Sequence, residues 1–178
     1  MSEFENAIST LLLGFVLGQA IDFTKYRWGI YRKKRAISDE VWDICENFKE
    51  KASRVKTILR ETNTGEVRGT SIPACISRVI FDHHYAEVAP FFTRKERAEL
   101  TVIYKCVENF NETLSTGVYN NLVSSNESML SLYYQSRMGC AAIEYYLAHK
   151  GKKCINDNKE ELEKIRVEIQ ELVDKYHI

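Results

Sequence analysis

The chain has 178 residues, enough for one domain with one core, and its 25 basic and 25 acidic side chains cancel to a formal net charge of zero. A neutral chain has no overall attraction for nucleic acid, so RNA stays an open ligand that the charge does not indicate. The cysteines form no C-x-x-C pair, which indicates neither a zinc site nor a disulfide framework. We therefore expect reduced, mostly buried thiols, no metal and no cofactor; the five cysteines are Cys45, Cys75, Cys106, Cys140 and Cys154.

An unbroken apolar stretch runs from Ala7 to Ile21, close to the N-terminus. Counted from Phe4 to Phe23, the segment would rise about 30 Å as a helix, which matches the hydrocarbon core of a bilayer. We predict a single-pass transmembrane anchor over residues 1–24. The alternative is a buried amphipathic helix of a soluble domain, because the strictly apolar part is short. A cleaved signal peptide is disfavoured, since its basic residues would precede the apolar run.

A basic and aromatic segment follows the anchor over residues 25–37, and we call it the basic collar. Its acid-free basic run places positive charge on one side of the anchor only, which predicts the N-terminus outside and the rest of the chain in the cytoplasm. Anionic lipid headgroups are the partner that such a cluster favours. The predicted membrane-surface residues are Lys25, Arg27, Trp28, Arg32, Lys33, Lys34 and Arg35.

Small and polar residues recur at every fourth position of the anchor and form one slowly drifting stripe on a helix. Gly14 and Gly18 allow the backbone of a neighbouring helix to approach closely, because no side chain stands between the two helices. Glycines are also common in membrane helices without such a role. The stripe predicts self-association, with its polar members facing other copies or a water-filled lumen; it consists of Asn6, Thr10, Gly14, Gly18 and Asp22.

The sequence predicts that residues 38–178 form a cytoplasmic bundle of about four to five helices, because apolar residues recur at helical spacing and no segment alternates apolar and polar residues as a strand would. The first apolar stripe runs from Val41 to Leu59, and Gly29 alone would interrupt its continuity with the anchor. Asn63-Thr64-Gly65 ends this helix. The remaining helices are predicted from Pro73 to about Val88, after a capping box at Thr93–Glu96, after Ser124–Glu127, and after Asn156–Asn158. The stripes of the third and fifth helices serve either the core or a contact between subunits.

The second predicted helix carries an arginine and a histidine, Arg78 and His83, at the R-x4-H spacing. Histidine can act as a general acid or base at a ribose hydroxyl while arginine holds the phosphate. The two positions lie about 140° apart on a helix, so only a flexible arginine could converge with the ring. A purely structural role is the alternative. Asp82, His83 and His84 make a poor metal site, because adjacent helical residues diverge.

The R-x4-H pair and the order of parts resemble two known groups of proteins. Arg78 and His83 resemble, in divergent form, the active-site motif of HEPN ribonucleases, which are helical bundles that assemble their sites from two copies. One membrane helix, a basic collar and a small helical domain resemble the small transmembrane accessory protein of type VI-B CRISPR systems. That resemblance implies a homo-oligomeric, ring-like and pore-like protein of the bacterial inner membrane. It also implies a role in antiviral defence, enhancing immunity by an RNA-guided ribonuclease through membrane depolarisation.

Three functions remain open from the sequence. The first, which we favour, is a pore-like, membrane-perturbing defence protein that is not an enzyme; whether it contacts the ribonuclease directly is open. The second is a membrane-tethered HEPN-type ribonuclease that uses Arg78 and His83. The third is a non-catalytic scaffold that recruits a partner to the membrane.

Overall fold

Every regular element in the described part of the chain is helical, which confirms the all-α prediction with five α-helices and one long apolar N-terminal helix. The computed structural model describes residues 3–65, 72–118 and 126–176. The elements are α1 (Glu3–Thr64), α2 (Val79–Val88), η1 (Ala89–Phe91), α3 (Arg94–Thr113), η2 (Leu114–Val118), α4 (Asn126–His149), η3 (Ile155–Asp157) and α5 (Lys159–Tyr176).

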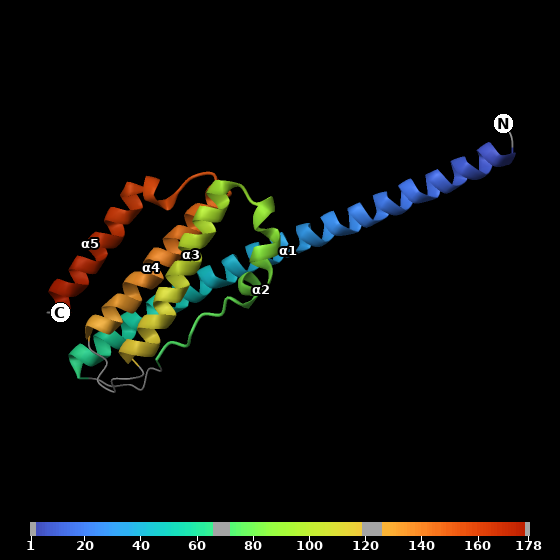
Figure 1. Cartoon of the computed structure of the whole chain (residues 1–178). Coiled ribbons are helices and arrows are strands. Elements are labelled where there is room, and N and C mark those ends of the chain that lie inside the picture. The colour runs from blue at the N-terminus through green and yellow to red at the C-terminus, as the bar shows by residue number, and fades with distance from the viewer. Residues whose placement is uncertain (1–2, 66–71, 119–125, 177–178) are drawn as a thin grey trace.

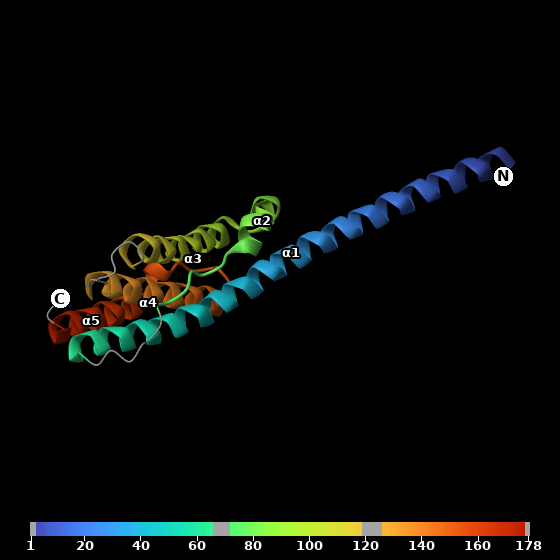
Figure 2. The same ribbon diagram turned by 90° about the horizontal axis from the view of Figure 1, so that it is seen from below.

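Helix α1 is a single uninterrupted rod of 62 residues, about 93 Å long at 1.5 Å per residue. Its N-terminal part projects away from the rest of the molecule, whereas its C-terminal half packs against α4, with α2 beside it (Figures 1 and 2). Gly29 does not break the helix, which continues on both sides of it. A Cβ atom at this position would meet nothing within 4 Å, so packing does not require the glycine. The rod ends at Thr64, followed by Gly65 with a φ of +70°, as predicted from Asn63-Thr64-Gly65.

The core of the bundle lies where the apolar stripes of α1, α3 and α4 meet. The first stripe, from Val41 to Leu59, is buried throughout, and so is the predicted stripe of α3. In α5 only Ile165 and Leu172 are fully buried, so this helix lies as an outer layer on α4. Burial within one chain shows that the stripes of α1 and α3 serve the core of the bundle. In the α5 stripe Leu162, Ile169 and Tyr176 are only half-buried, so a contact between subunits stays a prediction for that helix. The buried stripe residues of α3 and its continuation are Leu100, Ile103, Val107, Phe110 and Leu114.

Two boundaries agree with the sequence and a third lies partly outside the described residues. The capping box of α3 is present: Thr93 Oγ1 accepts from the Glu96 amide, and the Glu96 carboxylate accepts from the Thr93 amide. The last helix follows η3 and Asn158, as the predicted start at Asn156–Asn158 requires. Helix α4 begins at Asn126, and the predicted cap at Ser124 and Ser125 lies outside the described residues.

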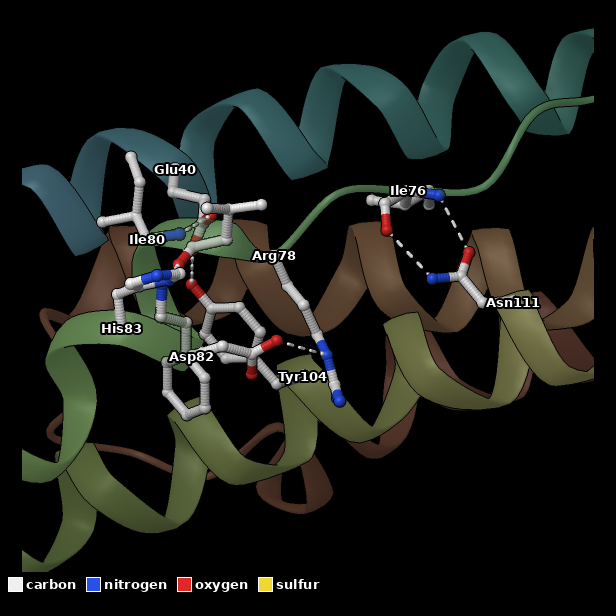
Figure 3. A network of polar contacts seen from close by, with 10 residues as sticks. Glu40, Ile76, Arg78, Ile80, Asp82, His83, Tyr104 and Asn111 are labelled. Atoms are coloured by element: carbon white, nitrogen blue, oxygen red, sulfur yellow. Dashed lines mark hydrogen bonds and ion pairs between the residues drawn. The ribbon is translucent and has the colours of Figure 1, made fainter.

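The prediction that Pro73 opens the second helix is wrong. Residues 72–78 form no helix, and α2 begins only at Val79. The reason is a pair of hydrogen bonds from α3: the Ile76 amide donates to Asn111 Oδ1 at 2.8 Å, and Asn111 Nδ2 donates to the Ile76 carbonyl at 2.9 Å (Figure 3). These bonds satisfy the backbone of Ile76 outside a helix, while Pro73 and Ile76 become buried.

Helices α1 and α4 lie close together where α4 carries a glycine. A Cβ atom added to Gly139 would lie 2.3 Å from Phe48 Cε2, so only glycine leaves room for the phenyl ring of α1. Phe48 is fully buried and also meets Phe110 of α3 edge-on, with the ring centroids 5.9 Å apart. The contact therefore joins the three central helices at one point.

Candidate functional site

The N-terminal part of α1 has the properties that a membrane-spanning helix needs. Among the described residues, α1 is the one helix long and apolar enough to cross a membrane, and the apolar part has no buried residues. Its large side chains, including Leu11, Phe15 and Val16, remain more than half exposed and make no core contact. A soluble amphipathic helix would bury one face, so this pattern favours lipid as the missing environment.

The small and polar stripe lies entirely on this exposed part of α1. Asn6, Thr10, Gly14, Gly18 and Asp22 are all exposed, and a Cβ atom at either glycine would meet nothing within 4 Å. The Thr10 hydroxyl donates to the Asn6 carbonyl at 2.9 Å, so Thr10 satisfies its own hydrogen bonding within the helix. The stripe is therefore accessible along its whole length to a second helix.

The basic collar divides into residues that face the bundle and residues that face outward. Lys33 pairs with Glu87 of α2 at 2.5 Å, and Lys34 donates to the Phe91 carbonyl at 2.8 Å while its ammonium lies 4.3 Å from the centroid of the Phe92 ring. These contacts hold the α2–η1 corner against α1. Of the predicted membrane-surface residues, those that remain exposed are Lys25, Arg27, Trp28, Arg32 and Arg35.

The core begins inside the collar rather than after it. Ile30 and Ile37 are buried, although both lie in the segment 25–37 that the sequence separates from the bundle. The cause is the η1 corner, which reaches back along α1 until Phe91 meets Tyr26 edge-on at 6.2 Å and lies 5.9 Å from the Arg27 guanidinium. The bundle therefore starts directly beneath the predicted membrane surface.

A buried carboxylate, Glu40, fastens α2 to α1. Its two oxygens accept from the amides of Ile80 and Phe81, at 2.8 and 2.9 Å, and one of them also accepts from the Tyr104 hydroxyl at 2.7 Å (Figure 3). The first amides of a helix lack intrahelical partners and carry positive partial charge, so an anionic acceptor fits there. Burial, followed by the hydrogen bond to Glu40, raises the pKa of Tyr104 well above its usual range. Glu40 therefore works as a cap supplied by another helix.

The structure does not bring Arg78 and His83 together within one chain. Arg78 precedes α2, and its Nε pairs with Asp82 Oδ2 at 3.2 Å, whereas His83 Nδ1 lies 3.0 Å from the Val79 carbonyl. In Figure 3 the arginine is directed toward Asp82 and away from the histidine ring. Both side chains have local partners on α2, which agrees with a structural role. Assembly of a site from two copies stays a prediction.

Two thiols far apart in the sequence meet in the core, which sequence spacing did not indicate. Cys45 of α1 and Cys140 of α4 are both buried, and their sulfurs lie 3.7 Å apart. The carboxylate of Glu144, one turn beyond Cys140, lies with them in a cluster whose potential ligand atoms are all within 4.8 Å of one another. The hydrogen bond between the thiols lowers the pKa of Cys45 and raises that of Cys140.

Outside this cluster, a second polar group ties α5 to the bundle. Glu168 of α5 accepts hydrogen bonds from the Tyr133 hydroxyl and from Arg137 Nε, the latter at 2.9 Å, and Lys56 of α1 lies 3.7 Å away. Burial raises the pKa of Glu168, but the two hydrogen bonds and the nearby cations more than offset it, so the net pKa is lowered. This group is structural, because its members satisfy one another.

Comparison of the chain with family models, with curated proteins and with solved structures finds no match in any of the three. The site must therefore be interpreted from its geometry. Two features were missed from the sequence, Glu40 and the Cys45–Cys140–Glu144 cluster. The sequence does contain a clue to Glu40: it falls between Ile37 and Ile44 on the face that α1 buries. A carboxylate on a buried face needs hydrogen-bond partners, which predicts a buried polar contact there. The sequence contains no comparable clue to the pair of Cys45 and Cys140, because the two cysteines are 95 residues apart.

Proposed function

We propose that this chain is a single-pass protein of the bacterial inner membrane that assembles through α1 into a pore-like homo-oligomer. In this proposal the N-terminus lies outside, the bundle lies in the cytoplasm, and the assembly perturbs the membrane to enhance defence by an RNA-guided ribonuclease. The observation that carries the membrane part is the division of α1, whose N-terminal half exposes apolar side chains while its C-terminal half forms the core. The defence role rests on the resemblance in size and order of parts.

The depth of the chain in the membrane follows from the helix rise. If Phe4 to Phe23 fills the hydrocarbon core, Ile30 lies about 10 Å further along the axis, just outside a headgroup layer about 5 to 8 Å thick. The exposed Lys25 and Arg27 then lie among the phosphates, and Trp28 lies at the interface, where aromatic side chains are enriched. Arg32 and Arg35 lie within about 10 Å of the headgroups, close enough to be attracted by anionic lipids. Because α1 is continuous, this arrangement places the bundle rigidly against the membrane rather than on a flexible tether.

Self-association is supported by the direction of the small and polar stripe. Residues spaced by four drift around a helix by about 40° per step, so the stripe from Asn6 to Asp22 inclines across the helix axis. Two such stripes pack best in a right-handed crossing of about 40°, as small-xxx-small helices do. The closest approach would be at Gly14 and Gly18, which offer open space for a neighbour.

The same crossing leaves room for the bundles. From the crossing point near Gly14 and Gly18 to Cys45, in the middle of the packed half of α1, the rod extends about 43 Å. Two rods inclined by about 40° are about 30 Å apart at that distance, which is the diameter of a small domain. Neighbouring bundles would therefore lie side by side without overlap. A ring of Asp22 side chains facing the lumen would favour cations.

The test is to replace both Gly14 and Gly18 with leucine in the full-length protein. We expect the variant to insert into membranes but to lose its oligomeric mass in mild detergent and its ion flux in reconstituted vesicles, because leucine keeps the backbones apart. The control is Ala20→Leu, which also introduces a leucine but on the opposite face of the helix, and it should preserve both readouts. An oligomer of unchanged mass in the glycine variant contradicts the proposal.

The link to an RNA-guided ribonuclease is tested separately in cells. With the ribonuclease present and its target RNA expressed, we expect membrane depolarisation that requires the stripe glycines. We also expect His83→Ala to retain this output in proportion to the folded protein that remains. Complete loss of function in a well-folded His83→Ala variant would favour the tethered ribonuclease instead.

A further inference from the structure

The thiols of Cys45 and Cys140, which lie in a cluster with Glu144, have the sulfur separation of a metal centre rather than that of a disulfide. Two thiolates bound to one tetrahedral zinc ion, at Zn–S distances of about 2.3 Å, lie about 3.8 Å apart. The two sulfurs of this chain are 3.7 Å apart, whereas a disulfide would need about 2.0 Å. The thiols therefore already have the separation that a shared zinc ion would require.

The third donor comes from the same helix as one of the thiols. Cys140 and Glu144 are one turn apart on α4, so their side chains share a face, and Cys45 meets them from α1. Both sulfurs lie on helices that are fixed by the core around Phe48, and the Glu144 side chain is 55% exposed. This combination provides two rigid soft ligands inside and one oxygen ligand at the surface, through which an ion can enter.

The charges around the cluster also fit a divalent cation. Two thiolates and one carboxylate around a doubly charged ion leave one negative charge, and Lys49 stands beside it with its Nζ 3.1 Å from Glu144 and 3.0 Å from Glu46. Lys49 offsets this charge but is shared with Glu46, so the whole group would keep one negative charge at the exposed edge of the site. Thiolate and carboxylate donors in a three-residue set are typical of zinc among the common divalent ions.

We propose that Cys45, Cys140 and Glu144 bind one zinc ion between α1 and α4, with water in the fourth position. Because α1 is the helix that enters the membrane, the ion would clamp the membrane rod to the bundle. This inference does not depend on the pore. The ion would hold together two helices that already pack, so it would add to the stability of the bundle and would not be required for its topology.

The experiment measures zinc in the full-length protein in detergent, purified with a reductant, loaded with zinc and dialysed. We expect stoichiometric zinc in the wild type, loss of zinc in Cys140→Ser, and at least about tenfold weaker binding in Glu144→Gln. Cobalt should give the absorption of thiolate-bound Co²⁺ in the wild type and lose it in Cys140→Ser. Because Cys140 is buried and its variant can misfold, Glu144→Gln, which changes an exposed side chain, carries the test independently.

Two matched controls separate a bound ion from a general effect of charge or of thiols. Glu46→Gln removes the other carboxylate that pairs with Lys49, and Cys106→Ala removes a half-buried thiol of α3 outside the cluster; both should retain wild-type zinc. The proposal is overturned if the wild type retains no zinc after dialysis. It is also overturned if Glu144→Gln binds zinc as tightly as the wild type, or if Glu46→Gln weakens binding equally.

Discussion

The buried cap supplied by Glu40 offers the most quantitative test of how α2 is held. Replacing Glu40 with glutamine keeps the shape but removes the negative charge and turns an NH₂ group toward donors that need an acceptor. The carboxylate accepts three hydrogen bonds at 2.7 to 2.9 Å. Losing charge assistance and leaving one donor unsatisfied should lower the free energy of unfolding by about 2 to 4 kcal/mol. That is a large share of the roughly 5 to 15 kcal/mol of a typical domain.

The assay is chemical unfolding of the full-length protein in detergent, combined with hydrogen exchange at the amides of Ile80 and Phe81. Both amides should exchange faster in Glu40→Gln. Tyr104→Phe removes one bond and leaves the helix end capped, so it should cost about 1 kcal/mol and leave those amides protected. Asp39→Asn, an exposed neighbour on α1, should stay within about 0.5 kcal/mol of the wild type. The reasoning is refuted if Glu40→Gln unfolds like Asp39→Asn.

Three further predictions concern packing, pH and orientation. Gly139→Ala should destabilise by about 1 to 3 kcal/mol in unfolding, because its methyl group would overlap Phe48, whereas Gly29→Ala, in open space, should stabilise by about 1 kcal/mol; equal effects would contradict the packing. Glu168 has a lowered pKa, so its contribution is complete above its ordinary value of 4.5 and is lost as pH falls through the lower folded value; Glu168→Gln should flatten that acid limb in a pH series of unfolding curves. An impermeant maleimide should label the exposed Cys75 in inverted membrane vesicles and leave it unlabelled in intact cells; the reverse pattern would show the opposite orientation.

Local signals in the sequence were sufficient for most of the helices. The three-four spacing from Val41 to Leu59 predicted a buried face, and the Thr93–Glu96 capping box marked the start of α3. Both signals act within a few residues, so they are visible without the fold. The sequence left open whether the anchor helix continues through Gly29. The structure shows one helix there, because a single glycine costs a helix only about 1 kcal/mol and the flanking turns compensate for it.

The errors arose where distant residues decide the local structure. Pro73 is common at the start of helices, yet Asn111 of α3 takes both hydrogen-bonding groups of Ile76 and holds that segment in a non-helical form. Cys45 and Cys140 meet only because Gly139 lets α4 approach α1, and no spacing in the sequence reports that approach. The ion pair of Arg78 with Asp82 is local by contrast, and it turns the arginine away from His83 within one chain, while a site assembled from two copies stays a prediction.

The basic residues of the collar lie in two different surroundings that composition alone does not distinguish. They follow the apolar run as the positive-inside pattern requires, but Lys33 and Lys34 point to the bundle and fix Glu87 and Phe91. Only the fold separates these structural lysines from the outward-facing Arg32 and Arg35. Neutralising Arg32 and Arg35 should therefore affect lipid contact, whereas neutralising Lys33 should affect the α2–η1 corner.

The most direct test of the proposed membrane assembly is single-particle imaging of the full-length protein in lipid nanodiscs. We predict a closed ring in which the N-terminal halves of α1 cross the bilayer around a central opening, with Gly14 and Gly18 at the contacts and the bundles side by side beneath the headgroups. A monomer or a simple dimer, with the stripe of α1 facing lipid, would contradict it.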